Sequence, residues 1–253
     1  MNRFELTGQC AIITGGGKGI GLATAHAFSR AGADVAVLDI DADAAREAAR
    51  AIAASGGKSI ALVCDVTDAR QVEASFDEAA SALGGIDILV NNAVTAVRKT
   101  ALELSLEQWD RVMDLNVKAT FVASRTAVRH MLRRGGGSIV NLASIMGLSG
   151  GLYPNASYQA SKGAVVNLTR ALALEWASEK IRVNAVAPTY VRTDLTVPIF
   201  SDPTTLERVM ANTPLGVLPD VDDIALAILY LASPAARCVT GITLPVDSGY
   251  LAR

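Results

Sequence analysis

Short apolar runs alternate with long alanine-rich stretches along almost the whole chain. The runs are rich in β-branched residues and nearly all apolar, which is typical of strands that are covered on both faces of a sheet. We expect seven strands, over residues 10–14, 34–39, 59–64, 86–91, 138–142, 181–187 and 242–246. We expect helices between them, over residues 19–31, 42–55, 69–83, 106–134, 158–178 and 221–232. This alternation predicts an α/β fold with a doubly wound parallel sheet and right-handed crossovers.

No linker, charge block or low-complexity segment interrupts the pattern, so we predict one domain over residues 1–253. The periodicity is weakest over 189–219, a stretch that holds four of the eight prolines. A loop-and-helix excursion of this length is often a functional lid. We therefore expect 189–219 to cover the substrate.

The composition excludes several classes of protein. Apolar residues make up 51% of the chain and the net charge is −2, without the basic surface of a nucleic-acid binder. The cysteines Cys10, Cys64 and Cys238 are far apart and predict neither a disulfide framework nor a metal site. The longest apolar run, 224–232, is too short to span a bilayer, and residues 1–8 do not resemble a signal peptide. We expect a cytoplasmic protein without nucleic-acid or membrane partners.

A glycine-rich turn follows the first predicted strand, as Thr14-Gly15-Gly16-Gly17-Lys18-Gly19-Ile20-Gly21. Glycines at a strand-to-helix turn allow a tight bend and let a pyrophosphate approach the helix N-terminus. The spacing is wider than that of the usual dinucleotide motif, and such turns also occur without a ligand. Asp39, at the end of the second strand and 18 residues beyond Gly21, stands where an acid meets the adenosine ribose.

Asp39 predicts NAD as the cofactor, because its carboxylate would face the additional phosphate of NADP. Two unit charges about 4 Å apart interact by roughly 4 kcal/mol at an effective dielectric near 20. Lys18 could offset part of this repulsion, but Ile40 and Asp41 follow Asp39 and supply no cation. The alternative role of Asp39 is that of a helix cap or turn residue.

Tyr158 and Lys162 stand four residues apart, on one face of a predicted helix. Lowering a tyrosine pKa from about 10 to 7 requires roughly 4 kcal/mol, which an ammonium and a cationic nicotinamide can supply. The alternative is an ordinary amphipathic pair. Tyr153 is the competing phenol, but Ser157, four residues further, offers no charge. We predict Tyr158 as the catalytic base.

Together these motifs resemble the short-chain dehydrogenase/reductase family over essentially the whole chain, and the resemblance implies a Rossmann-type sheet of seven parallel strands. The segments that carry it are 14–21, Cys64-Asp65-Val66, Asn91-Asn92-Ala93, Leu115-Asn116-Val117, 138–144, 158–162, Arg182-Val183-Asn184, 188–193 and 240–250.

The resemblance also implies roles for individual residues. Ser144 would bond the reacting oxygen, Tyr158 would exchange its proton, Lys162 would bind the nicotinamide ribose and lower the Tyr158 pKa, and Asn116 would hold a water in the proton path. Asp65 and Val66 would bracket the adenine, and Val191 and Thr193 would contact the carboxamide. The full predicted cofactor site is Gly15, Lys18, Gly19, Ile20, Gly21, Asp39, Asp65, Val66, Asn92, Ala93, Tyr158, Lys162, Val191 and Thr193.

Three positions depart from the family pattern. Val94 and Thr189 stand where the family has glycine, and Ser248 interrupts the closing Asp-Gly-Gly. A β-branched residue resists a positive φ angle, so these positions put the backbone near the cofactor in question.

The leading hypothesis is an NAD-dependent alcohol dehydrogenase or carbonyl reductase for a small polar secondary alcohol such as a sugar or polyol. One alternative is a 3-oxoacyl thioester reductase, for which an arginine stripe at Arg125, Arg129 and Arg133 could dock an acidic carrier. Another is a catalytically silent NAD-binding scaffold. The helices over 106–134 and 158–178 carry more apolar positions than one sheet-facing stripe needs, which predicts a homo-oligomer, most simply a tetramer.

Overall fold

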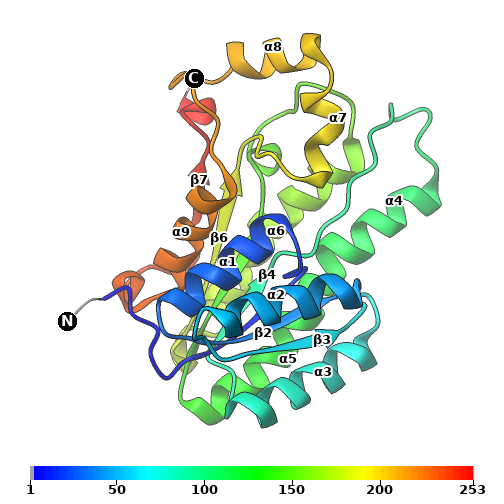
Figure 1. Ribbon diagram of the computed structural model, residues 1–253. Coiled ribbons are helices and arrows are strands. Elements are labelled where there is room, and N and C mark those ends of the chain that lie inside the picture. Colours follow the sequence, from blue (N-terminus) through cyan, green and yellow to red (C-terminus); the bar gives the residue numbers. More distant parts are fainter. Residues whose placement is uncertain (1–2, 253) are drawn as a thin grey trace.

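A seven-stranded sheet forms the centre of the computed structural model, which describes residues 3–252 (Figure 1). All its strand pairs are parallel, and the order is β3-β2-β1-β4-β5-β6-β7. The strands are β1 Cys10–Thr14, β2 Asp34–Asp39, β3 Ser59–Val63, β4 Ile88–Asn91, β5 Gly137–Leu142, β6 Ile181–Pro188 and β7 Thr243–Val246. The predicted fold class is confirmed, and strand ends differ from the prediction by no more than two residues.

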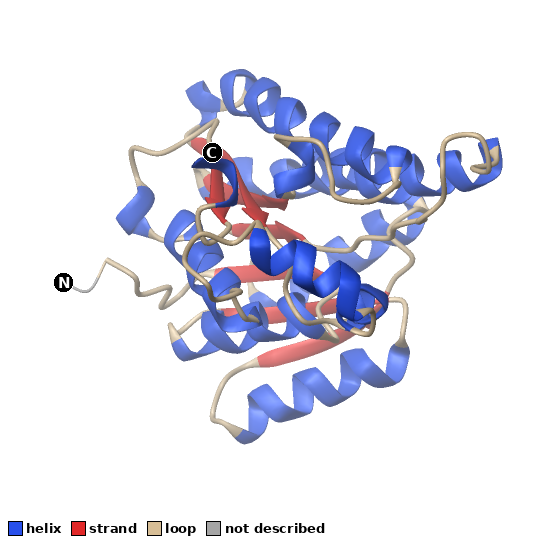
Figure 2. Ribbon diagram, turned by 90° about the horizontal axis from the view of Figure 1, so that it is seen from above, coloured by secondary structure: helices blue, strands red, loops and turns tan. Residues whose placement is uncertain are grey.

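Helices cover both faces of the sheet (Figure 2). They are α1 Gly19–Arg30, α2 Ala42–Ala54, α3 Ala69–Leu83, α4 Leu106–Met113, α5 Ala119–Arg134, α6 Ala156–Glu175, α7 Val197–Phe200, α8 Pro203–Ala211 and α9 Val221–Ala232. One buried cluster packs α3, α5 and α6 against the sheet, with Phe76 and Met131 at its centre. The other packs α1, α2 and α9, with Phe28 and Ile52. The continuous apolar strand runs thus reflect burial on both faces.

Two helical predictions need correction. The helix expected over 106–134 is interrupted by a π-helical turn, Asp114–Lys118, which separates α4 from α5. The helix expected over 158–178 begins earlier, at Ala156, and its α-helical part ends at Glu175. Apolar periodicity marks a helical region but not its exact ends or a single wider turn within it.

The order of the strands reverses between β1 and β4. In open α/β sheets such a switch point opens a crevice at the carboxyl ends of the strands, where ligands bind. The glycine turn after β1 and the segment after β4 meet there. The segment 189–219 contains α7 and α8, which lie above β6 and next to the C-terminus (Figure 1). The Leu215 N–H donates to the Ser248 carbonyl across this contact.

None of the helices in residues 3–252 has the length and apolar character needed to cross a membrane.

Candidate active site

A cleft of about 1360 Å³ runs along the carboxyl ends of the strands. Most of the predicted cofactor residues line it: Gly15, Lys18, Gly19, Ile20, Asp39, Asp65, Val66, Asn92, Ala93 and Thr193. Val191 does not line the cleft, because its side chain is buried in the core with α1, α2 and α9. The cleft is large and partly apolar, as small-molecule and cofactor sites are.

The turn after β1 requires glycine at several positions. Gly15 and Gly19 have φ angles of +61° and +54°, in the left-handed region that residues with side chains avoid. A Cβ at Gly21 would lie 2.2 Å from the Gly15 carbonyl oxygen. The Asn92 amide stabilises the turn, since it donates to the carbonyls of Thr14 and Gly15 at 3.1 and 2.8 Å. The turn is thus held open at the N-terminus of α1, where the helix dipole favours an anion.

Asp39 stands at the end of β2 with both oxygens bonded to the backbone. Oδ2 accepts from the Gly17 N–H at 2.9 Å, and Oδ1 accepts from the Asp41 N–H at 3.0 Å. These bonds fix the carboxylate at the rim of the cleft beside the glycine turn. Asp39 is therefore both a turn residue, which was the alternative interpretation, and part of the cleft wall.

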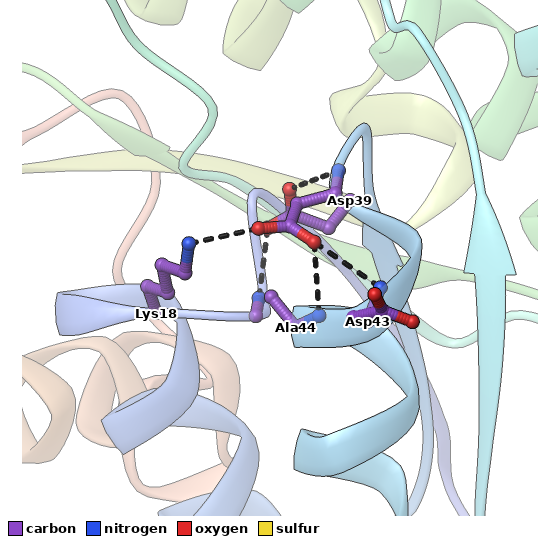
Figure 3. A network of polar contacts seen from close by, with 6 residues as sticks. Lys18, Asp39, Asp43 and Ala44 are labelled. Carbon is purple, nitrogen blue, oxygen red and sulfur yellow. Dashed lines mark hydrogen bonds and ion pairs between the residues drawn. The ribbon is translucent and has the colours of Figure 1, made fainter.

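Lys18 points toward Asp41, which stands two residues beyond Asp39 at the start of α2 (Figure 3). The ammonium and the Asp41 carboxylate are 2.8 Å apart, and the contact raises the pKa of Lys18 and lowers that of Asp41. Asp41 also caps α2 by accepting from the N–H groups of Asp43 and Ala44, at 3.1 Å each. The cation that could have met an additional phosphate is thus already paired.

Ser144, Tyr158 and Lys162 lie close together beyond the point between β1 and β4 where the strand order reverses. Ser144 follows β5, and the other two stand one turn apart on α6. Ser144 and Tyr158 line the same small cavity, and the influence of the Ser144 side chain lowers the Tyr158 pKa. The Lys162 ammonium lies 5.7 Å from the centroid of the Tyr158 ring and donates to the Leu142 carbonyl. The structure therefore brings three of the four predicted catalytic residues into contact.

Burial dominates the ionisation of this group. It raises the pKa of Tyr158 to about 12, against the opposing effect of the Ser144 hydrogen bond. It lowers the pKa of Lys162 to about 7. Both shifts have the same cause, since burial disfavours whichever form is charged. The lowering of the Tyr158 pKa by Lys162 and the nicotinamide therefore stays a prediction, and burial is the effect that it has to overcome.

Asn116 lies in the π-helical turn between α4 and α5. Its amide nitrogen donates to the Thr95 carbonyl at 2.9 Å and to the Ser161 hydroxyl at 3.0 Å, and its oxygen accepts from the Thr95 N–H at 3.0 Å. Both N–H donors are therefore in use, and the side chain joins the segment after β4 to α6. Single π-helical turns inside α-helices are frequent at functional sites.

A smaller cavity of about 40 Å³ lies beside the catalytic group, lined by Ser144 and Tyr158. Four further polar side chains line it as well: Arg98, Asn155, Thr189 and Tyr190. Others are engaged elsewhere. The Thr95 backbone is bonded to Asn116, and Arg192 packs over the Phe200 ring at 4.3 Å.

Comparison with known proteins agrees with this geometry. A family model described as Enoyl-(Acyl carrier protein) reductase matches residues 15–251. Galactitol 2-dehydrogenase (L-tagatose-forming) of Cereibacter sphaeroides is 46% identical, over 98% of this chain and 96% of its own. A short-chain type dehydrogenase/reductase from Mycobacterium marinum superposes with a TM-score of 0.96 at 38% identity, covering 100% and 99% of the two chains. The chain belongs to the short-chain dehydrogenase/reductase family.

A second solved structure in this family bears on the cofactor. A gluconate 5-dehydrogenase from Burkholderia cenocepacia, in complex with NADP and tartrate, has a TM-score of 0.96 at 35% identity and covers 100% and 98% of the chains. This dehydrogenase/reductase is accordingly an oxidoreductase that uses a nicotinamide cofactor on an alcohol or carbonyl substrate.

The three departures from the family pattern have different outcomes in the structure. Neither Val94 nor Thr189 has a positive φ angle, so the missing glycines require no strain. Ser248, in contrast, has a φ of +54°. Its neighbour Asp247 holds the turn by accepting from the N–H groups of Gly249 and Leu251, at 3.0 and 2.9 Å.

Sequence reasoning missed a buried polar network under the site of this dehydrogenase/reductase. The Asn91 amide donates to Ser124 at 2.9 Å and to Asn141 at 2.8 Å, and Asn141 donates to Thr169 at 3.0 Å. The network ties β4 and β5 to α5 and α6. Its signal was an asparagine within each of two otherwise apolar strands, which implies a buried partner.

Proposed function

We propose that the protein is an NAD-dependent dehydrogenase that oxidises a secondary hydroxyl of a sugar or polyol. The observation that carries the proposal is that Ser144 and Tyr158 line one small cavity together with further polar side chains. A site built to bond several hydroxyls discriminates against analogues that leave its polar groups unpaired. The names of the galactitol and gluconate dehydrogenases support the same substrate class.

The residues of the cleft fit a dinucleotide. Glycines without room for a Cβ leave the N-terminus of α1 accessible to a pyrophosphate, and Asp39 can accept from the ribose hydroxyls. In this proposal Asp65 and Val66 contact the adenine, and Lys162 binds the second ribose. The cofactor, when bound, supplies the hydride acceptor and a positive charge.

Tyr158 acts in this proposal as the acid–base group. Ser144 bonds the substrate oxygen, and Tyr158 removes the hydroxyl proton as hydride leaves the carbon. Because the protein's own groups leave the Tyr158 pKa at about 12, positive charge on Lys162 and on the nicotinamide has to stabilise the phenolate. Asn116 acts as a positioning residue, since its amide joins α6 to the segment after β4.

NAD is preferred over NADP in this proposal. A phosphate on the adenosine ribose would meet the Asp39 carboxylate, which lines the cleft, and Asp41 adds a second carboxylate two residues further along the chain. Lys18 does not neutralise them fully, because it forms an ion pair with Asp41. One solved relative contains NADP and another, a 7 alpha-hydroxysteroid dehydrogenase, contains NADH, so the fold accepts either cofactor and we assign the choice to these side chains.

The arginine stripe of the alternative hypothesis receives no support from the structure. Arg125, Arg129 and Arg133 are exposed, and Arg129 is paired with Glu73 at 3.1 Å. Arg125 lies over the ring of Phe121. A stripe with these local partners is an ordinary solvated helix face, so we do not propose a carrier-protein substrate.

A substrate panel tests the proposed function. NADH formation is measured with C4–C6 polyols and sugars and, in parallel, with cyclohexanol-type and aryl alcohols. We expect the highest kcat/KM among the polyhydroxylated compounds. A hundredfold advantage for the apolar alcohols would overturn the substrate class and leave the dehydrogenase chemistry intact.

A further inference from the structure

Arg98 stands in the wall between two cavities. The inner cavity, of about 40 Å³, is the one that Ser144 and Tyr158 line. The outer cavity, of about 300 Å³, is lined by Arg98 and Tyr153 together with Lys99. A water molecule needs at least about 10–15 Å³, so the inner cavity holds only a few atoms. A substrate of four to six carbons that reacts at Tyr158 therefore extends past Arg98 into the outer cavity.

The Arg98 guanidinium is only partly satisfied by the protein. One Nη donates to the Leu195 carbonyl at 2.7 Å, and the group lies 5.7 Å from the centroid of the Tyr153 ring. Its Nε is buried and has no hydrogen-bond partner. None of the ion pairs formed within residues 3–252 includes Arg98. Arg98 is thus a half-buried cation that lines both cavities and has no ion-pair partner within residues 3–252.

The charges around the outer cavity do not neutralise Arg98. Lys99 adds a second cation to its wall, and Glu103 is the acid that lines it. The Glu103 carboxylate accepts from the hydroxyl and the N–H of Thr100, at 2.7 and 3.3 Å, so its hydrogen bonds go to its own loop. The outer cavity therefore carries a net positive charge.

We propose that the substrate carries a carboxylate, which binds Arg98 at the end of the molecule remote from the reacting hydroxyl. This inference rests on the proposed function and narrows its substrate class to polyhydroxylated acids of the sugar-acid type. The planar guanidinium matches a carboxylate through paired N–H donors. An anion there also supplies the counter-charge that a partly desolvated cation otherwise lacks.

A purely structural role of Arg98 is the competing explanation, because its bond to Leu195 joins the segment after β4 to 189–219. Arg208 offers a matched control. It also donates from its guanidinium to a backbone carbonyl near the site, that of Leu152 at 2.8 Å, but it lines neither cavity. Loss of a structural bond would affect charged and neutral substrates alike, whereas loss of a carboxylate site affects the acids selectively.

The test measures kcat/KM with NAD for matched acid and polyol pairs: D-gluconate and D-glucitol, D-galactonate and galactitol, threonate and threitol. We expect the wild type to prefer the acid of at least one pair by about tenfold or more. Arg98→Gln should lower kcat/KM for that acid by about 100-fold and for its polyol by less than about fivefold. Arg98→Lys should retain part of the preference, and Arg208→Gln should change acid and polyol equally.

Binding provides a readout that does not depend on turnover. In the presence of NADH, D-gluconate should alter the nicotinamide fluorescence of the wild type, D-glucitol should not, and Arg98→Gln should abolish the difference. The inference is overturned if polyols are oxidised in preference to acids, or if Arg98→Gln lowers kcat/KM for acids and polyols equally. Failure of every alcohol in the panel would contradict the proposed function instead, and gluconate binding would then decide the role of Arg98.

Discussion

Asp39 and Asp41 are two nearby carboxylates beside the cofactor cleft that have different partners. Asp39 is bonded to the backbone of the glycine turn, and Asp41 is paired with Lys18. From the sequence we expected Asp39 to repel the additional phosphate of NADP and Lys18 to offset part of this repulsion. The sequence could not show that Lys18 is paired with Asp41 instead, because this ion pair depends on how the turn and α2 meet in space.

The choice of cofactor should therefore respond to both residues. We predict that the wild type has a higher kcat/KM with NAD than with NADP, and that Asp39→Ala reduces the ratio of these two values. Asp41→Asn should reduce this ratio as well, because Lys18 becomes available to bind a phosphate. Measurement of kcat/KM with both cofactors checks this, with Asp43→Asn, which lies beside the pair but does not contact Lys18, as the control. A preference for NADP in the unmodified protein would refute the argument.

Lys162 shows the conflict between function and stability at a single residue. Its folded pKa, about 7, is depressed below the unfolded value, so the unfolded chain binds the proton more tightly. The free-energy cost of burying the charged Lys162 side chain is fully present below pH 7 and disappears as the pH rises toward 10.5. Lys162→Met should stabilise the protein at pH 6.5 by about 2 kcal/mol and abolish activity.

Thermal unfolding without added cofactor measures the Lys162 effect. The advantage of Lys162→Met should shrink as the pH is raised from 6.5 to 9.5. A variant that is less stable than the wild type at pH 6.5 would show that the buried ammonium is well solvated or paired, contrary to this account.

At the scale of elements, the sequence predicts what repeats locally and misses what depends on distant partners. The strands are recognised because an apolar run covered on both faces needs only its own residues. The π-helical turn is not recognised, because Asn116 is held by Thr95 and Ser161, 21 and 45 residues away. A loop-and-helix excursion was expected over 189–219, but the bounds of the short helices α7 and α8 were not predicted, because prolines and a mixed surface conceal their periodicity.

The glycine turn can be tested as one element. A methyl group at Gly21 would collide with the Gly15 carbonyl and with the Asn92 amide at 2.6 Å, so the turn would have to shift. We predict that Gly21→Ala weakens NAD binding by about 100-fold or more, because the donors at the start of α1 are displaced. Calorimetric titration with NAD measures this loss.

Gly163→Ala is the matched control for the glycine turn. Its added Cβ would lie 3.8 Å from the Gly147 carbonyl oxygen, in ordinary contact, and alanine favours the helix. NAD affinity should therefore be unchanged. Equal losses in both variants would indicate a general effect of altered helices rather than a specific cofactor turn.

At the scale of the whole molecule, the sequence argument for association needs revision. Four of the apolar positions that suggested a second interface, Ala123, Val165, Leu172 and Trp176, are buried within the chain. Other residues on the same helices are exposed instead, among them Leu132 on α5 and Leu174 on α6, with exposed fractions of 48% and 83%. An apolar pattern does not show whether a buried face packs against the same chain or against another chain, so the sequence could not separate the two.

We still predict a homotetramer, now on the basis of these exposed side chains. Light scattering at micromolar concentration should give the mass of four chains, and Leu174→Glu should reduce it. Val63→Glu, on the edge strand β3 and also half-exposed, should leave the mass unchanged. A stable monomer in the unmodified protein would refute the prediction.

The central claim is that Tyr158 transfers the proton while hydride passes to NAD, and Tyr158→Phe tests it most directly. The phenyl ring keeps the packing of α6, and the substitution removes only the hydroxyl of a residue that lines the small cavity with Ser144. The measurement is NADH formation with the best polyhydroxylated substrate, together with NAD affinity for both proteins. The account predicts that turnover falls to less than about 1% of the wild type while NAD affinity changes by less than about threefold. Retention of more than a few per cent of the turnover would contradict it, because another group would then have to be the base.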